Sequence, residues 1–69
     1  MDITAQKEIG KLQLEIDAIE EEIYVMAERF GLVYFSSYEY WELNNKIISN
    51  GYKIREYIGM SLFINEHIN

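Results

Sequence analysis

The fold is decided by residues 9–30, which read IGKLQLEIDAIEEEIYVMAERF. Seven apolar side chains in this stretch follow one another at alternating intervals of three and four residues. That spacing is the a and d pattern of a heptad repeat, which places all seven on one stripe of an α-helix. This stripe, called the seam below, comprises Ile9, Leu12, Ile16, Ile19, Ile23, Met26 and Phe30. A helix with such a seam needs a packing partner along its whole length.

The side of this helix opposite the seam is polar. It carries Lys11, Gln13, Glu15, Asp17, Glu20, Glu21, Glu22 and Glu28, a composition typical of a solvated face. No proline interrupts the stretch, and Gly31 follows Phe30, where a left-handed residue commonly ends a helix. We therefore predict a helix over about residues 4–30.

A second helix is predicted over about residues 37–65. Ser36 or Ser37 can cap its N-terminus, and Ser36 followed by Glu39 matches a capping box. The connection, about residues 31–36, is short. Because a short connection makes two long helices antiparallel neighbours, we expect a helical hairpin.

The apolar face of the second helix is broader than a two-stranded seam. It comprises Tyr40, Leu43, Ile47, Ile54 and Ile58, with Trp41, Ile48 and Leu62 beside them. One hairpin cannot cover all of this surface, which favours assembly into a dimeric bundle. Asn50 followed by Gly51 is a turn signal, so the sequence leaves open whether this helix is continuous or breaks there.

The predicted fold is all-α, with residues 1–69 forming one helical-hairpin domain that assembles into a dimeric helical bundle. A domain of 69 residues buries only about 60% of its unfolded surface and usually needs a further stabilising device. The chain has no cysteine and a single histidine, His67, which excludes disulfides and zinc as that device. Self-association is therefore expected, through the seam residues Ile9, Leu12, Ile16, Ile19, Ile23 and Met26.

Charge and hydropathy restrict the kinds of partner. The formal net charge is −6, with twelve acidic and six basic residues, whereas phosphate binding needs clustered lysine and arginine. No apolar run reaches the roughly 18 residues that span a bilayer, and the N-terminus lacks the apolar core of a signal peptide. We expect a cytoplasmic protein that binds neither nucleic acid nor membrane.

Few residues in the chain are suited to catalysis. A Ser-His-acid site would need His67, near the C-terminus, to be fixed beside a serine, and no pattern in the sequence indicates this. The carboxylates of residues 20–22 point around the helix and do not converge on one cation. We therefore predict no catalytic residues, no metal site and no cofactor. A non-enzymatic protein is favoured over an enzyme.

Aromatic residues are concentrated at the predicted turn. Five of the ten aromatic residues lie within eight positions, namely Tyr34, Phe35, Tyr38, Tyr40 and Trp41. They either cap the open end of the core or form a recognition surface, since tyrosine and tryptophan are enriched at binding hot spots. We take these five as the candidate partner-binding residues.

Two runs carry a resemblance to a known family. AERFGL at Ala27–Leu32 and YWELN at Tyr40–Asn44 resemble conserved runs in the small sporulation-type aspartyl-phosphate phosphatases, and the resemblance spans residues 19–48. It implies a two-helix protein that acts on response-regulator receiver domains. The family's Ser-Gln-Glu-Leu-Asp core falls on Tyr40–Asn44, and its aspartate is Asn44 here, so the acidic group associated with activity is missing.

The leading hypothesis is a small non-enzymatic regulator or inhibitor that self-associates and binds a host or cellular protein through the aromatic residues. Small acidic chains of this kind include inhibitors that bacteriophages make against host proteins, which is an analogy at the level of fold. Two alternatives stay open. One is a diverged phosphatase-like protein that binds a receiver domain, and the other is a purely structural oligomer.

Overall fold

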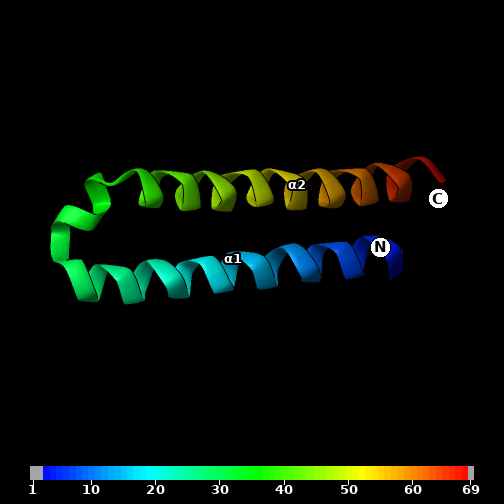
Figure 1. The fold of residues 1–69 in the computed structure, drawn as a ribbon. Helices are drawn as coiled ribbons and strands as arrows, with labels where there is room; N and C mark the ends of the chain where they lie inside the picture. Colours follow the sequence, from blue (N-terminus) through cyan, green and yellow to red (C-terminus); the bar gives the residue numbers. More distant parts are fainter. Residues whose placement is uncertain (1–2, 69) are drawn as a thin grey trace.

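The chain folds into two long helices joined by a short 3-10 helix. The computed structural model describes the backbone of residues 3–68 and the side chains of residues 3–60. The elements are α1 (Ile3–Phe30), η1 (Gly31–Ser36) and α2 (Tyr38–Ile68). Figure 1 shows α1 and α2 side by side and antiparallel, with both chain ends at one end and η1 at the other. The described residues contain no strand, so the predicted all-α hairpin is confirmed.

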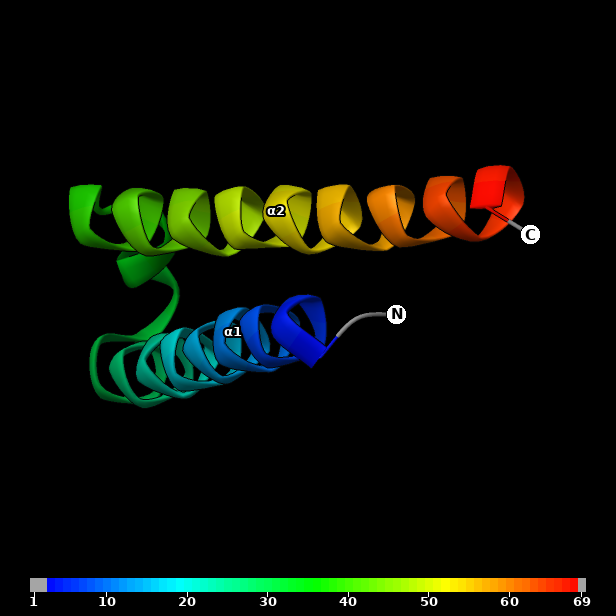
Figure 2. The ribbon, with the colours of Figure 1, turned by 90° about the vertical axis from the view of Figure 1, so that its right-hand side faces the viewer.

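The segment between the two helices has the predicted length. Gly31 ends α1 with φ at +74°, the left-handed conformation expected there. The next residues form the 3-10 helix η1 and lead the chain across to α2, as Figure 2 shows from the side. The short connection predicted over about residues 31–36 is therefore a 3-10 helix.

Ser37 caps the N-terminus of α2. Its Oγ accepts a hydrogen bond from the Tyr40 amide at 3.2 Å and donates one to the Tyr34 carbonyl oxygen at 2.6 Å. The predicted capping box of Ser36 with Glu39 is wrong, because the helix begins one residue later and Tyr40 occupies the position where the box needs a glutamate.

The second helix is continuous through Asn50 and Gly51 and reaches Ile68, beyond the predicted end near residue 65. The Asn50 side chain forms hydrogen bonds with α1 rather than with its own backbone. Because asparagine favours turns chiefly through such local backbone bonds, its partner across the hairpin removes the reason for a break.

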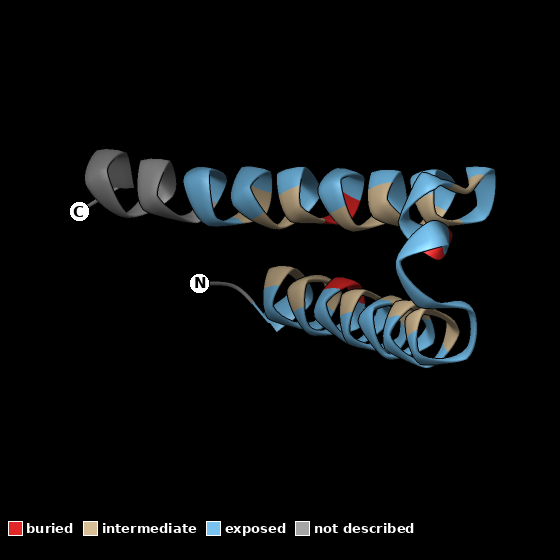
Figure 3. Cartoon of the chain, turned by 90° about the vertical axis from the view of Figure 1, so that its left-hand side faces the viewer, coloured by how far each residue is buried: buried red, intermediate tan, exposed pale blue. Residues whose placement is uncertain are grey.

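The core lies along the facing sides of the two helices, as Figure 3 shows by its buried and half-buried positions. The seam faces α2, with Leu12 buried and the other seam residues up to Met26 half-buried, namely Ile9, Ile16, Ile19, Ile23 and Met26. Phe30, the last predicted seam residue, is exposed because the chain leaves α1 directly after it. The matching inner stripe of α2 is Tyr40, Leu43, Ile47, Asn50, Ile54 and Tyr57.

One residue predicted for this face of α2 does not contribute to the core. Ile58 is exposed, while Tyr57 beside it is half-buried, so the inner stripe keeps alternating intervals of three and four residues up to Tyr57. Leu62 lies outside the residues whose side chains are described. The inner stripe of α2 is therefore as narrow as the seam that it faces.

The hairpin buries little of its surface. Among residues 3–60, only Leu12, Tyr34 and Asn50 are buried, and no side chain is completely enclosed. The chain measures 53 × 17 × 12 Å and exposes 5575 Å², whereas a folded monomer of 8.2 kDa is expected to expose about 4,500 Å². About 1,000 Å² of surface is therefore in excess of what a globular monomer of this mass exposes.

Candidate protein-binding surface

The five aromatic residues predicted at the turn divide into two groups. Tyr34, Phe35 and Tyr40 form one cluster, in which every pair of rings meets edge to face with centroids 5.0 to 6.0 Å apart. Tyr34 is only 4% exposed and Tyr40 is half-buried, while Phe35 covers them from the solvent side. These three rings close the end of the core, which is the structural interpretation of the cluster.

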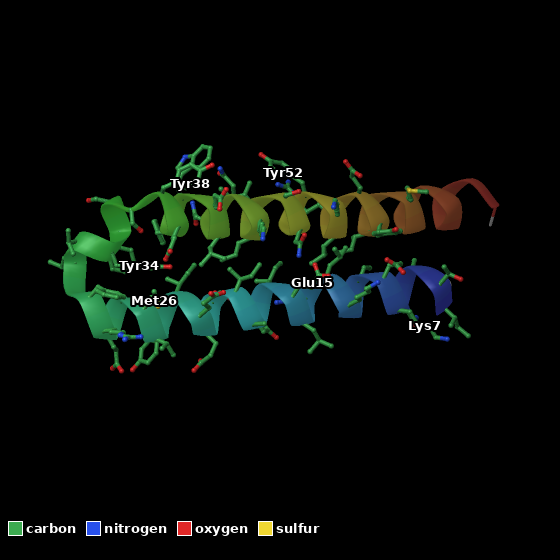
Figure 4. The ribbon with its side chains drawn as sticks, viewed as in Figure 1. Lys7, Glu15, Met26, Tyr34, Tyr38 and Tyr52 are labelled. Atoms are coloured by element: carbon green, nitrogen blue, oxygen red, sulfur yellow. The ribbon has the colours of Figure 1, made fainter. Side chains whose placement is uncertain are left out.

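Tyr34 lies between the two helices, close to Met26 in Figure 4. Its hydroxyl is buried and has no hydrogen-bond partner among the described residues. Burial raises the pKa of this hydroxyl above its usual value, and the negative charges of Glu39 and Glu22 raise it further. Tyr34 is thus held as a neutral phenol that contributes mainly apolar contact area.

The second group is the pair Tyr38 and Trp41. Their rings stack with centroids 5.8 Å apart and an angle of 26° between the planes. Tyr38 is 70% exposed and Trp41 is 59% exposed. Tyr38 points away from α1 in Figure 4. This pair, called the Tyr38–Trp41 pair below, contributes little to the core of the hairpin.

The Tyr38 ring has a second contact besides Trp41. Its hydroxyl donates a hydrogen bond to the Glu42 carboxylate one turn later, which raises the pKa of the hydroxyl, and the charge of Glu42 raises it further. Because Tyr38 is held by a ring on one side and a carboxylate on the other, it is partly ordered before any partner binds.

The second helix exposes further apolar side chains that were not among the candidate site residues. Ile48 and Tyr52 are exposed and border a shallow hollow at Gly51, which Arg55 completes. Figure 4 shows Tyr52, like Tyr38, on the side of α2 away from α1. The spacing of Trp41, Ile48 and Tyr52, seven and four residues apart, is the signal that could have found this stripe.

The six residues predicted for self-association occupy the inner side of α1. They pack against α2 of the same chain and are buried or half-buried there. Their contact with a second copy stays a prediction. In addition, no segment of the helices, as far as they are described, is long and apolar enough to cross a membrane.

Comparison with known proteins does not identify the chain. No known protein family, curated protein or solved structure matches it. The resemblance to the aspartyl-phosphate phosphatases therefore stays a prediction. The function is therefore inferred from the exposed side chains of the hairpin.

Proposed function

We propose that the chain is a small non-enzymatic regulator that self-associates and binds a target protein through the Tyr38–Trp41 pair. The observation that carries this proposal is that two large stacked rings stand in solvent on the outer side of α2. Tyrosine and tryptophan supply much of the binding energy at protein interfaces, because they bury a large area at a low cost in conformational entropy.

The arrangement of the pair favours binding over a purely structural role. The stacking with Trp41 and the hydrogen bond to Glu42 restrict the Tyr38 ring before binding, which lowers the entropy that an interface has to overcome. The hydroxyl and the indole N–H give each ring a polar group at its edge, which can fix the orientation of a partner. The net charge of −6 would also speed the approach of a basic target surface.

The proposal is tested by capture and affinity measurements. A tagged chain is used to capture proteins from lysates of candidate hosts, and the captured protein is identified by mass spectrometry and purified. Its affinity is then measured by calorimetry for the wild type, for a Tyr38→Ala, Trp41→Ala variant and for a control, Leu14→Ala, Val25→Ala. The control removes two exposed apolar side chains from α1.

If the pair is a hot spot, its loss should cost at least about 2 kcal/mol, which corresponds to an affinity at least about 25-fold weaker. The control should bind as the wild type does, and circular dichroism should show equal helix content in all three proteins. Equal affinity of a folded Tyr38→Ala, Trp41→Ala variant would refute the proposed role of the pair.

A diverged phosphatase-like protein is the second candidate. What supports it is the helical hairpin with its turn at Gly31 and the half-buried Asn44, which lines a groove between the helices. In this case the target would be a receiver domain. If phosphorylated receiver domains have the same lifetime with and without the protein, it does not act as a phosphatase on them.

A further inference from the structure

The two flanks of the hairpin, where α1 and α2 meet solvent side by side, differ in character. At about 100° per residue, positions 20, 24 and 27 lie on one side of the seam, and positions 8 and 15 lie on the other. The surface next to position 24 is called the aromatic flank and comprises Tyr24, Phe35, Asn44, Ile48 and Gly51, with Glu20 and Arg55 beside them. The opposite surface is called the charged flank and comprises Glu8, Glu15, Glu39, Lys53 and Glu56, with an apolar hollow at Met26, Phe30 and Val33 near the turn.

The aromatic flank has both projecting rings and recesses. Tyr24 and Phe35, which both line this flank, are exposed. A groove of about 360 Å³ runs between the helices beside Tyr24, and the hollow at Gly51 lies further along α2. A Cβ atom built on Gly51 would meet no atom within 4 Å, so this recess is open. The apolar or small groups that line the groove are Ile23, Ala27, Phe35 and Ile47, and Glu20 and Asn44 line it as well.

We infer that a second copy of this chain covers the aromatic flank and forms a two-fold symmetric four-helix dimer with it. This inference rests on the self-association in the proposed function and specifies the surface that it uses. In a two-fold interface, the same patch of both copies must be complementary to itself. A patch that contains both projecting rings and open recesses meets this condition, since the rings of each copy can enter the recesses of the other.

The surface area agrees with a second copy as the occupant. The chain exposes about 1,000 Å² more than a globular monomer of its mass, and a stable interface of standard size buries about 800 Å² on each partner. The broad side of the hairpin measures 53 by 17 Å, which is about 900 Å² in projection. Covering one flank therefore accounts for the excess surface.

The distribution of charge selects between the two flanks. Charged residues are depleted at the centres of interfaces, whereas tyrosine and phenylalanine are enriched there. The charged flank has acidic and basic groups over both helices, including the Glu15 carboxylate that accepts a hydrogen bond from Asn50 at 2.9 Å. Covering that flank would desolvate these charges, which is costly without new partners. The aromatic flank carries fewer charges, Glu20 beside its groove and Arg55 beside its hollow, and is the less costly surface to bury.

The first test is the mass in solution by sedimentation equilibrium. The wild type is expected to have twice the mass of the chain at micromolar concentration. A Tyr24→Glu, Ile48→Glu variant places charges on the aromatic flank and should raise the dissociation constant of the dimer at least 100-fold. The control is Leu14→Glu, Val25→Glu, which adds the same charge to exposed positions of α1 and should keep the dimer.

A second measurement covers the case in which the separated chain does not fold. Because the chain has no cysteine, single cysteines can be introduced at Ile48 and at Leu14 and treated with a short bismaleimide cross-linker. Ile48→Cys should form covalent dimers at high yield, since this position lies within the interface. Leu14→Cys should form far fewer, because this exposed position lies on the outer side of α1, outside the inferred interface.

The outcomes separate this inference from the proposed function. A monomeric wild type, an unchanged mass for Tyr24→Glu, Ile48→Glu, or equal cross-linking at both cysteines would overturn the inferred dimer. Target binding is measured independently, through the affinity of the Tyr38→Ala, Trp41→Ala variant. Loss of target affinity in that variant supports the binding role, whatever the mass measurements show.

Discussion

Replacing Asn50 with leucine is expected to raise the melting temperature of the hairpin by about 5 °C. Asn50 is only 7% exposed and lies in the inner stripe of α2, where apolar residues occupy the neighbouring positions. Its Nδ2 donates to Glu15 Oε2 at 2.9 Å and lies 3.5 Å from the Leu12 carbonyl oxygen, at the limit of a hydrogen bond. It is therefore a polar residue at a core position of a helical pair.

The expected gain follows from two opposing contributions. Loss of the hydrogen bond costs about 1 kcal/mol, and Glu15 is exposed, so water can replace the lost donor. Burying a leucine side chain in the same place contributes about 2 kcal/mol. The difference is about 1 kcal/mol, which corresponds to roughly 4 to 8 °C in a domain of this size.

The assay is thermal unfolding followed by circular dichroism at equal protein concentrations. Asn45→Leu, at an exposed position of the same helix, corrects for the higher helix propensity of leucine. Asn50→Ala, which loses the hydrogen bond without adding a large apolar group, should unfold at a lower temperature than the wild type. A melting temperature for Asn50→Leu below that of the wild type would refute the reasoning, because the bond to Glu15 would then outweigh the burial of leucine.

Three further predictions follow from local features of the fold. Ser37→Ala should lower the unfolding free energy by about 1 kcal/mol in urea titrations, since the Tyr40 amide loses its capping oxygen, whereas Ser36→Ala should change it little. Gly10→Ala should raise the unfolding free energy by about 1 kcal/mol, because a Cβ at this helical position meets no atom within 4 Å; a loss of stability would indicate a neighbour at that surface. Glu42→Gln should lower the pKa of Tyr38 toward its usual value, as followed by NMR of the tyrosine rings. Because the pKa of Tyr38 is raised in the folded state, the stability linked to it is complete below the unfolded pKa near 10 and is lost as the pH rises through the folded value. The Glu42→Gln protein should therefore lose less stability at alkaline pH. Identical titrations of the two proteins would contradict the assigned cause.

The hairpin itself could be predicted because its signals are local and strong. The regular spacing of the seam specifies the inner side of α1, and Gly31 specifies where that helix ends. Both features act within a few residues, so a single sequence reveals them. The partner of Asn50 could not be predicted in this way, because Glu15 is 35 residues away and becomes its neighbour only after the chain has folded back.

The division of the aromatic residues could not be predicted either. A 3-10 helix has three residues per turn instead of 3.6, so η1 breaks the phase that would relate the sides of α1 to those of α2. The spacing of α2 predicts Tyr40 on the inner face, but the contact of Tyr34 and Phe35 with its ring depends on the path of η1. The aromatic residues were therefore recognisable as a group, but their separate roles depend on the geometry of the turn.

The small area of the Tyr38–Trp41 pair raises the question of how the protein could hold a target, and the inferred dimer offers an answer. One Tyr38–Trp41 pair covers much less than the roughly 800 Å² that a stable interface buries on each partner. A two-fold dimer has two such pairs in a fixed relative orientation, so a target with two sites, or two linked targets, would engage the second pair at a high effective concentration. The gain would come from avidity without any new contact in either site. Disrupting the dimer through the aromatic flank should therefore weaken binding to a two-site target much more than binding to a single isolated site.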